Sequence, residues 1–559
     1  MDELKPAVQH VINEAPAGGG RVRRDKSKVH YYGPNAESKT AWAREMGLAV
    51  NTTGDSYLGG VIGSTLEERQ RLARAKVEKI VADLAKLESP GIPAQIALLW
   101  LVSCIPSRFE YLARLCSPDV LRPSSQFLDN AMFSSYCRLA GIHDAEATPQ
   151  LRRLVFTPIS LGGRGLRSAE AMLERSFLGS QALTAPHLAP LVQQEPADSE
   201  RLQSIAKAMD SVKETISEEL ADELLPSAPE TFTAHFAHDS DERRKEAREL
   251  QETITTGAKL LLDDKLLAEA KEPRAKALLL ACRAQGASLA LTTAPHGRHL
   301  GLSKEQVTTN ERLRLGLAPE RSMPIHCHCG HANGQYSFDP WHSLSCQSEL
   351  GTSVYDRHDD VKFALAHWVT QLGGRVKIEP RRLHEQGPGP QAPPRAGRMR
   401  RRQAVPAAAG AGEVKVGGRR REGKVFDLFI WGLGKPIALD VTVVHPLAPS
   451  RVQKSAVNPE SVLAEAEAEK HGLYDGLADR VGADFFAFAV ETTGRLGNDA
   501  LAFIRRLIQE GARFKHVFAP KQVVQGIYRT VAVAVARGNA DIVRSNLAAT
   551  RLASWDDHR

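Results

Sequence analysis

The stretch KVFDLFIWGLGKPIALDVTVV, residues 424–444, decides the fold of the C-terminal part of this chain. Its two halves are apolar and rich in β-branched or aromatic residues, and GLGK separates them, so the stretch predicts a β-hairpin. Each half carries one carboxylate, Asp427 or Asp440. A charged carboxylate in a buried strand is costly to desolvate unless it is paired or binds a metal. The hairpin therefore predicts two acids side by side at one end of a sheet.

The segments around this hairpin alternate between helix and strand patterns. Residues 357–374 fit a helix closed by glycine and residues 375–380 a short strand, whereas 461–474, 484–492 and 498–511 fit a helix, a strand and a helix. The resulting order, α-β-β-β-α-β-α, predicts a small α/β domain with a mixed sheet covered by helices. We place this domain at residues 351–538.

The two aspartates suit metal chemistry. Paired carboxylates on neighbouring strands form an oxygen-rich site for Mg²⁺, which can polarise a phosphodiester and activate water. Lys470, on the following helix, can stabilise developing charge or orient the water, and Glu379 is a candidate third carboxylate. The competing interpretation is that Asp427 and Asp440 cap exposed strand ends.

A basic stretch interrupts this domain at residues 381–424. It holds twelve Lys or Arg and three Asp or Glu, a local net charge of +9, so the rest of the chain sums to −2 out of the formal +7. Its Pro, Gly and Ala content and lack of any period predict a disordered basic insertion. Such a polycation suits a phosphate backbone, although it can equally be a solvated insertion. The candidate nucleic-acid contacts are Arg400, Arg401, Arg402, Arg419, Arg420 and Arg421.

A cysteine cluster, CHCGHANGQYSFDPWHSLSC, occupies residues 327–346. Its spacing, C-x-C-x12-H-x3-C, provides four N/S ligands, which is the closed set of a structural zinc site. The predicted zinc ligands are Cys327, Cys329, His342 and Cys346, with His326, His328 and His331 as rival imidazoles. We predict a small zinc knuckle at residues 321–350; the alternative is a set of unrelated buried thiols.

The upstream half predicts helices. Between about residues 67 and 290 apolar residues recur every three or four positions, as in amphipathic helices. We therefore expect an all-α N-terminal and middle region, and a multidomain protein overall. The expected parts are residues 1–65, 66–183 and 184–320, with a tail at 539–559.

Composition limits the class of protein. With 42% apolar and 25% charged residues the chain is not globally disordered, and seven cysteines are too few for a disulfide scaffold, which favours a reducing compartment. The apolar stretch Ala94–Ile105 is too short to span a bilayer, and the N-terminus lacks the apolar region of a secretory signal. We expect no membrane partner.

The order of these motifs resembles the C-terminal end of non-LTR retrotransposon polyproteins that carry a restriction-like endonuclease of the PD-(D/E)xK fold. The motifs are Cys327-x-Cys329, His342-x3-Cys346, Arg357-His358-Asp359, Glu379-Pro380, Asp427-x12-Asp440-Val-Thr-Val and the downstream helix Glu465-x4-Lys470. Upstream, YLGGVIGS (57–64) resembles the end of a reverse-transcriptase palm, and FTPISLGGRGLRSAEAMLERSFLGS (156–180) the stretch after its thumb. The resemblance makes 1–65 a palm remnant, 66–183 thumb-like and 184–320 a helical connector.

This resemblance implies a nuclease that nicks one strand of target DNA, so that the 3′ hydroxyl primes reverse transcription of the element's RNA. Asp427 and Asp440 would bind the divalent metal. Because Thr442 occupies the usual lysine position after Asp440, Lys470 would serve as a displaced catalytic lysine. Arg357 and His358 would contact DNA. A chromosomal substrate implies the nucleus, and the arginine runs in the insertion are candidate import signals as well as candidate phosphate contacts.

The sequence also departs from the family pattern. Phe426 stands where the motif has Pro, the stretch between Glu379 and Asp427 is unusually long, and no Y/F-x-D-D polymerase site precedes residue 57. We therefore do not expect a self-sufficient reverse transcriptase. The alternative functions are a nucleic-acid-binding remnant or domesticated protein with a decayed nuclease, and a helical scaffold for protein partners.

Overall fold

The computed structural model describes residues 4–18, 22–192, 196, 199–238, 240–297, 299–320, 341–346, 352–380, 425–513 and 519–556. The predicted insertion 381–424, with the six arginines named as candidate nucleic-acid contacts, lies outside these residues, as do Cys327, Cys329 and the rival imidazoles. The chain forms two compact units. The helical unit comprises residues 1–350, 446–459 and 539–559, and the sheet unit comprises residues 351–445 and 460–538.

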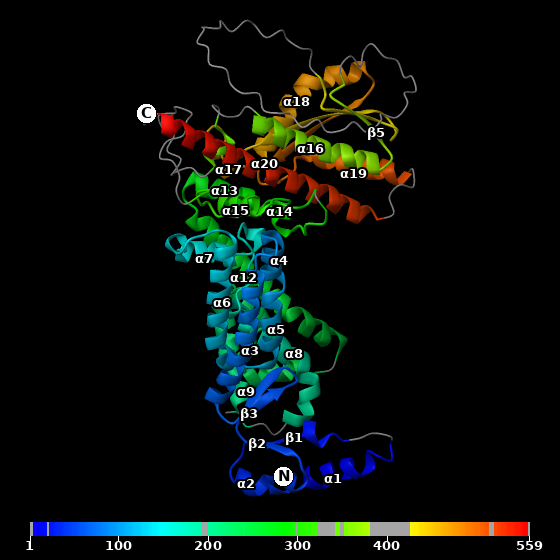
Figure 1. Cartoon of the computed structure of the whole chain (residues 1–559). Helices are drawn as coiled ribbons and strands as arrows, with labels where there is room; N and C mark the ends of the chain where they lie inside the picture. Colours follow the sequence, from blue (N-terminus) through cyan, green and yellow to red (C-terminus); the bar gives the residue numbers. More distant parts are fainter. Residues whose placement is uncertain are drawn as a thin grey trace. The chain divides into compact units, whose positions relative to one another are not determined.

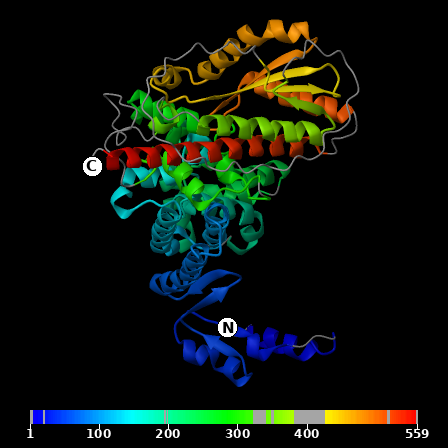
Figure 2. The same cartoon turned by 45° about the horizontal axis from the view of Figure 1, so that its top comes forward.

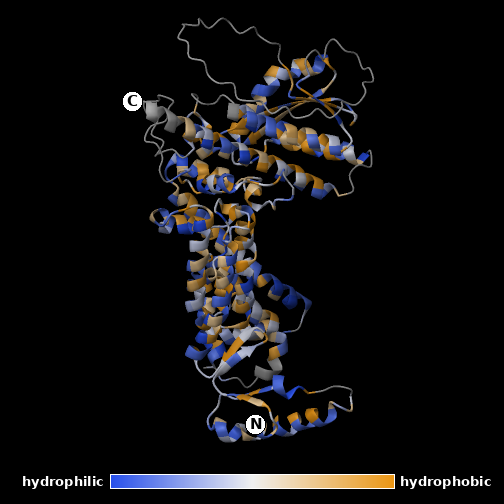
Figure 3. Cartoon of the chain, viewed as in Figure 1, coloured by the Kyte–Doolittle hydropathy of each residue, from blue (hydrophilic) through white to orange (hydrophobic). Residues whose placement is uncertain are grey.

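The helical unit is built mainly from amphipathic helices, whose ribbons carry hydrophilic and hydrophobic residues side by side (Figures 1 and 3). Its helices are α1 (Leu4–Glu14), α2 (Ala36–Glu45), α3 (Leu66–Leu87), α4 (Ala94–Ser103), α5 (Ile105–Leu115), α6 (Pro118–Leu139), α7 (Pro149–Phe156), α8 (Leu173–Val192), α9 (Glu200–Lys213), α10 (Glu218–Leu224), α11 (Pro229–Ala237), α12 (Asp241–Glu269), α13 (Pro273–Arg283), α14 (Leu289–Thr292), α15 (Lys304–Arg314) and α17 (Val452–Val457). The predicted helices of this region are therefore confirmed.

The prediction of an all-α N-terminal region is wrong. Strands β1 (Lys28–His30) and β2 (Ala49–Asn51) pair in parallel, and β3 (Gly54–Tyr57) pairs antiparallel with β4 (Gly60–Gly63). These strands are three or four residues long, too short for a hydrophobic period to identify them. A second difference concerns residues 446–459, which group with the helical unit and not with the predicted domain 351–538.

Helices α4 and α5 form part of the helical unit's core. By length and composition alone the stretch Ala94–Leu115 is apolar enough to cross a membrane, and 44% of its apolar window is buried inside the protein. Leu98, Leu101 and Phe109 pack in a cluster with residues of α3 and α6. This stretch therefore supplies core residues in the folded chain.

The sheet unit has the predicted order of elements, followed by one further helix that was not predicted from the sequence. It contains α16 (Thr352–Gln371), β5 (Arg375–Ile378), β6 (Leu428–Trp431), β7 (Ile437–Val444), α18 (Ser461–Arg480), β8 (Asp484–Glu491), α19 (Asn498–Arg513) and the first part of α20 (Pro520–Asp556). The four strands form one sheet in the order β5-β6-β7-β8, antiparallel except for the parallel pair β7–β8. The predicted hairpin and mixed sheet are confirmed.

Helices cover both faces of this sheet (Figure 2). One face carries Leu428, Leu439 and Val441, which pack with residues of α16, α19 and α20. The other face carries Ala438 and Ala487, which pack with residues of α18. Alternate residues of β7 thus face different helices, as the period of a strand requires.

A buried carboxyl ends strand β8. Glu491 is 1% exposed, and the Thr493 hydroxyl donates a 3.0 Å hydrogen bond to its Oε2. Burial raises the pKa of Glu491 to about 7, although the nearby Arg495 charge opposes the rise. The side chain therefore folds in its neutral form below that pH.

We predict that Glu491 makes the sheet unit less stable at alkaline pH. Because its pKa is higher in the folded than in the unfolded chain, the carboxyl has no effect below about pH 4.5 and costs stability as the pH rises through about 7. The full difference is about 3 kcal/mol. Denaturant unfolding at pH 5 and pH 8, followed by hydrogen exchange of β7 and β8, should show that Glu491→Gln removes this loss. Glu460→Gln, an exposed carboxyl in the same unit, is the control; equal pH slopes in wild type and Glu491→Gln would contradict the prediction.

Candidate active site

Three predicted carboxylates occupy one row across the sheet. The ladder pairs Ile378 with Leu428 and Leu428 with Leu439, so its next step aligns Glu379 with Asp427 and Asp427 with Asp440. The Glu379 amide donates a 2.9 Å hydrogen bond to the Asp427 carbonyl, which continues the ladder beyond both strands. Directly opposed residues on neighbouring strands are close neighbours. The predicted pairing of Asp427 with Asp440 thus follows from the strand register.

Asp440 lies on the α18 face of the sheet and is 4% exposed. The Lys470 ammonium lies 2.6 Å from its Oδ2, and the Tyr474 hydroxyl, one turn further along α18, also interacts with this carboxylate. Burial, and then the charge of Asp427, raise the pKa of Asp440, whereas Lys470 and Tyr474 lower it. The structure therefore places Lys470, the predicted displaced lysine, beside Asp440.

Asp427 is held from two sides. Its Oδ2 accepts hydrogen bonds from the Val441 amide at 2.7 Å and from His358 Nε2 at 3.0 Å. Burial, the largest single effect, lowers the pKa of His358, but the hydrogen bond and charge of Asp427 and the hydrogen bond to Asp359 together raise that pKa above its ordinary value. Asp427 Oδ1 makes no hydrogen bond with the part of the chain that the structure describes, so it can accept a further ligand.

A second lysine, which sequence reasoning missed, forms an ion pair with Glu379. Lys362 of α16 is 1% exposed, and its ammonium lies 2.6 Å from Glu379 Oε1 and 2.7 Å from Asp359 Oδ1. Burial opposes its charge, but these two carboxylates raise the pKa of Lys362. The spacing Asp359-x2-Lys362, which places both residues on one helix face, was the available signal.

The predicted DNA contact of Arg357 does not fit the structure. Arg357 is 3% exposed, and a Cβ added at Gly538 of α20 would meet its side chain at 2.4 Å. Burial lowers the pKa of Arg357 to about 10. Its helical neighbour His358 instead reaches the carboxylate row, because consecutive residues of a helix point in different directions.

These residues suit a divalent cation in part. Among the described residues no three His, Cys, Asp or Glu side chains come together as a complete metal site. Mg²⁺ needs fewer protein ligands, since it keeps several waters and binds one or two carboxylates together with substrate phosphates. Asp427 and Asp440, whose negative charges repel each other, are the residues that would hold Mg²⁺.

Only half of the predicted zinc site is described. His342 begins a short 3-10 helix, His342–Leu344, and Cys346 is 2% exposed. Cys327 and Cys329 lie outside the described residues, so the zinc assignment stays a prediction.

We predict that Lys470 offsets the cost of burying Asp440. Lys470→Met should destabilise the folded chain by about 2–3 kcal/mol at pH 8, because an isolated charge is left in the sheet. Because the pKa of Asp440 is raised in the folded chain, its charge costs stability only as the pH rises above the ordinary carboxyl pKa, and the loss in Lys470→Met should shrink toward pH 4. Denaturant unfolding at both pH values measures this.

The control is Lys435→Met, which removes a more exposed ion pair with Asp484 in the same unit and should cost well under about 1 kcal/mol. Adding Asp440→Asn to Lys470→Met should restore most of the stability. If the double variant is no more stable than Lys470→Met, the pairing is not what stabilises Asp440.

No protein-family model matches this chain, and no curated protein matches it.

Proposed function

We propose that the sheet unit is a Mg²⁺-dependent DNA endonuclease. The observation that carries the proposal is the row formed by Glu379, Asp427 and Asp440, with the ammonium of Lys470 on its buried member. Paired carboxylates with an adjacent cation are the groups that metal-assisted phosphodiester hydrolysis requires. The basic stretch at residues 381–424 supports DNA as the substrate.

The side chains in and beside the row would have separate roles in cleavage. Asp427, through its Oδ1, and Asp440 would hold Mg²⁺, which would polarise the scissile phosphate. Lys470 would stabilise charge that develops there, in place of the lysine that Thr442 replaces. His358 orients Asp427, since it donates to the oxygen that the Val441 amide also contacts.

In the wider setting, the resemblance suggests the nicking module of a non-LTR retrotransposon, with element RNA as a second partner and the nucleus as its compartment. The helical unit would then bind nucleic acid as well. A decayed nuclease that only binds nucleic acid is the alternative, and it shares every feature except cleavage.

The test is nicking of a supercoiled plasmid by the full chain. We expect nicks with Mg²⁺, none with EDTA, and a loss of about 100-fold or more in Asp440→Asn and Asp427→Asn, because each removes a metal ligand. Asp484→Asn, which changes a partly exposed carboxylate of β8 outside the row, should retain wild-type activity. DNA binding without nicks in the wild type would establish the alternative, and binding that salt does not weaken would exclude both.

We also propose one structural zinc ion per chain, bound by Cys327, Cys329, His342 and Cys346. Cys346→Ser should lower the zinc content of the purified chain from about one ion to near zero, because a tetrahedral site fails with three ligands. Cys104→Ser, which changes an exposed cysteine of the helical unit, is the control. Elemental analysis with full zinc in Cys346→Ser would reject this ligand set.

A further inference from the structure

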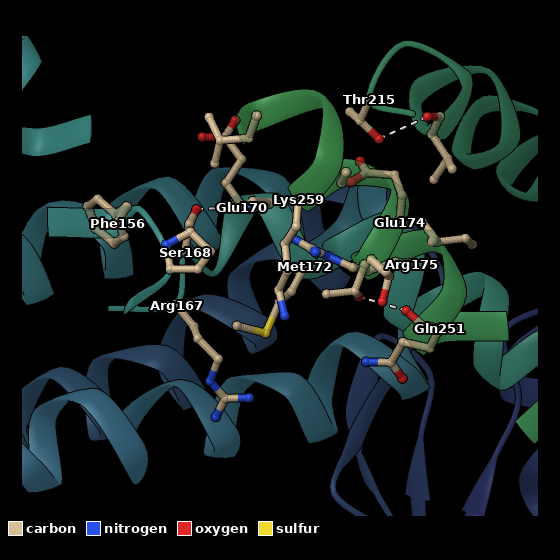
Figure 4. A pocket seen from close by; sticks show the side chains of 18 of the residues that line it. Phe156, Arg167, Ser168, Glu170, Met172, Glu174, Arg175, Thr215, Gln251 and Lys259 are labelled. Atoms are coloured by element: carbon tan, nitrogen blue, oxygen red, sulfur yellow. Dashed lines mark hydrogen bonds between the residues drawn. The ribbon is translucent and has the colours of Figure 1, made fainter. Parts of the chain in front are cut away.

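The helical unit contains a cavity that the proposed nuclease does not use. It has a volume of about 1030 Å³ and is lined by residues of α5, α6, α12 and the segment from Phe156 to Arg175. This volume lies at the upper end of the range for ligand sites. Figure 4 shows the side chains that line it, including Arg167, Glu174 and Arg175.

The wall of this cavity holds more cations than carboxylates. Arg114 and Arg167 share one carboxylate, Glu110, at 3.0 and 3.1 Å, and Arg122 pairs with Glu174. Apart from these residues and Arg175, the lining holds equal numbers of acids and cations. The acids are Glu170, Glu214 and Glu252, and the cations are Arg248, Lys259 and Lys265. Arg175 is thus the fourth arginine around only two acids, Glu110 and Glu174.

Arg175 is a partly buried guanidinium that makes no hydrogen bond with any described residue. Burial lowers the pKa of Arg175, while the charges of Glu174 and Glu110 oppose that effect and the charge of Arg167 adds to it. This guanidinium stays charged, and its accessible N–H groups can donate to a ligand in the cavity. The position therefore calls for an anion.

Apolar side chains lie in the same cavity. Phe156, Ile159 and Met172 line it together with the arginines. Arginine forks match the planar, bidentate geometry of phosphate, and an apolar surface beside them accepts a base or a ribose. A ligand that carries both parts fits this cavity better than an inorganic anion.

We propose that this cavity binds the phosphate of a nucleotide, with Arg175 and Arg167 as its contacts and Phe156 and Met172 beside the nucleoside. The nucleotide is either free or the end of a single strand. This site is independent of the nuclease, because its residues belong to the helical unit alone.

Binding to the full chain tests the proposal by calorimetry with four probes: adenosine monophosphate, adenosine, inorganic phosphate, and a 5′-phosphorylated thymidine octamer. We expect the monophosphate or the octamer to bind, and adenosine to bind at least about tenfold more weakly. Binding of the monophosphate identifies a free nucleotide, and binding of the octamer alone identifies a strand end. If inorganic phosphate binds as tightly as the monophosphate and the octamer, the proposed contacts with the nucleoside are wrong.

Arg175→Gln should weaken the binding by about tenfold or more, since it removes a charge-assisted contact. Arg167→Gln provides a second variant should Arg175→Gln not fold, which circular dichroism reports. Arg71→Gln, an exposed arginine of α3 that pairs with Glu68, is the matched control. Unchanged affinity in both cavity variants would overturn the proposal. If the octamer still binds both variants as tightly as the wild type, its binding site is elsewhere, for example in the basic stretch 381–424.

Discussion

The ion pair between Lys470 and Asp440 is the interaction on which the arrangement of the sheet unit depends. Strand β7 is buried on both faces, and Asp440 is the one charged residue within it. A carboxylate in that position is tolerable only if a counter-charge reaches it. Helix α18 supplies this charge, and it packs on β7 and β8 through small residues such as Ala438 and Ala487. The packing of α18 on the sheet therefore brings Lys470 to Asp440, and the resulting ion pair in turn stabilises that packing.

The strand register extends this constraint across the sheet. Because Asp427 continues the β6–β7 ladder, it falls opposite Asp440, and Glu379 falls opposite Asp427 in the same way. The insertion at residues 381–424, which is 44 residues long, lies between Glu379 and Asp427 in the sequence. Even so, the Glu379 amide bonds to the Asp427 carbonyl. The described residues on either side of the insertion thus occupy adjacent ladder positions, and the carboxylates stay in one row.

Much of the sheet unit could be predicted from sequence, because its elements are long enough to show their period. The hairpin, the parallel strand β8 and the helices around them carry 3.6- or 2-residue patterns, and the two aspartates stand out as charges in apolar runs. The first four strands were missed because they are too short to show a pattern. Lys362 and Tyr474 were missed for a different reason: each lies on an amphipathic helix, where a polar residue usually faces solvent. Only the tertiary fold turns them toward the carboxylates, and the same fold turns Arg357 away from solvent.

The energetic cost of the site bears on its function. Burial and mutual repulsion raise the pKa of Asp440, so the folded chain carries charges that an apolar substitute would avoid. Binding to a DNA backbone requires cations and gains nothing from buried acids. A sheet that served only to hold nucleic acid would be more stable without Asp427 and Asp440, and it would not need His358 and Lys470 beside them. Groups that cost stability and converge on one position are typical of catalytic sites, where activity requires them. This reasoning favours the endonuclease over the binding remnant, since only cleavage uses the carboxylates.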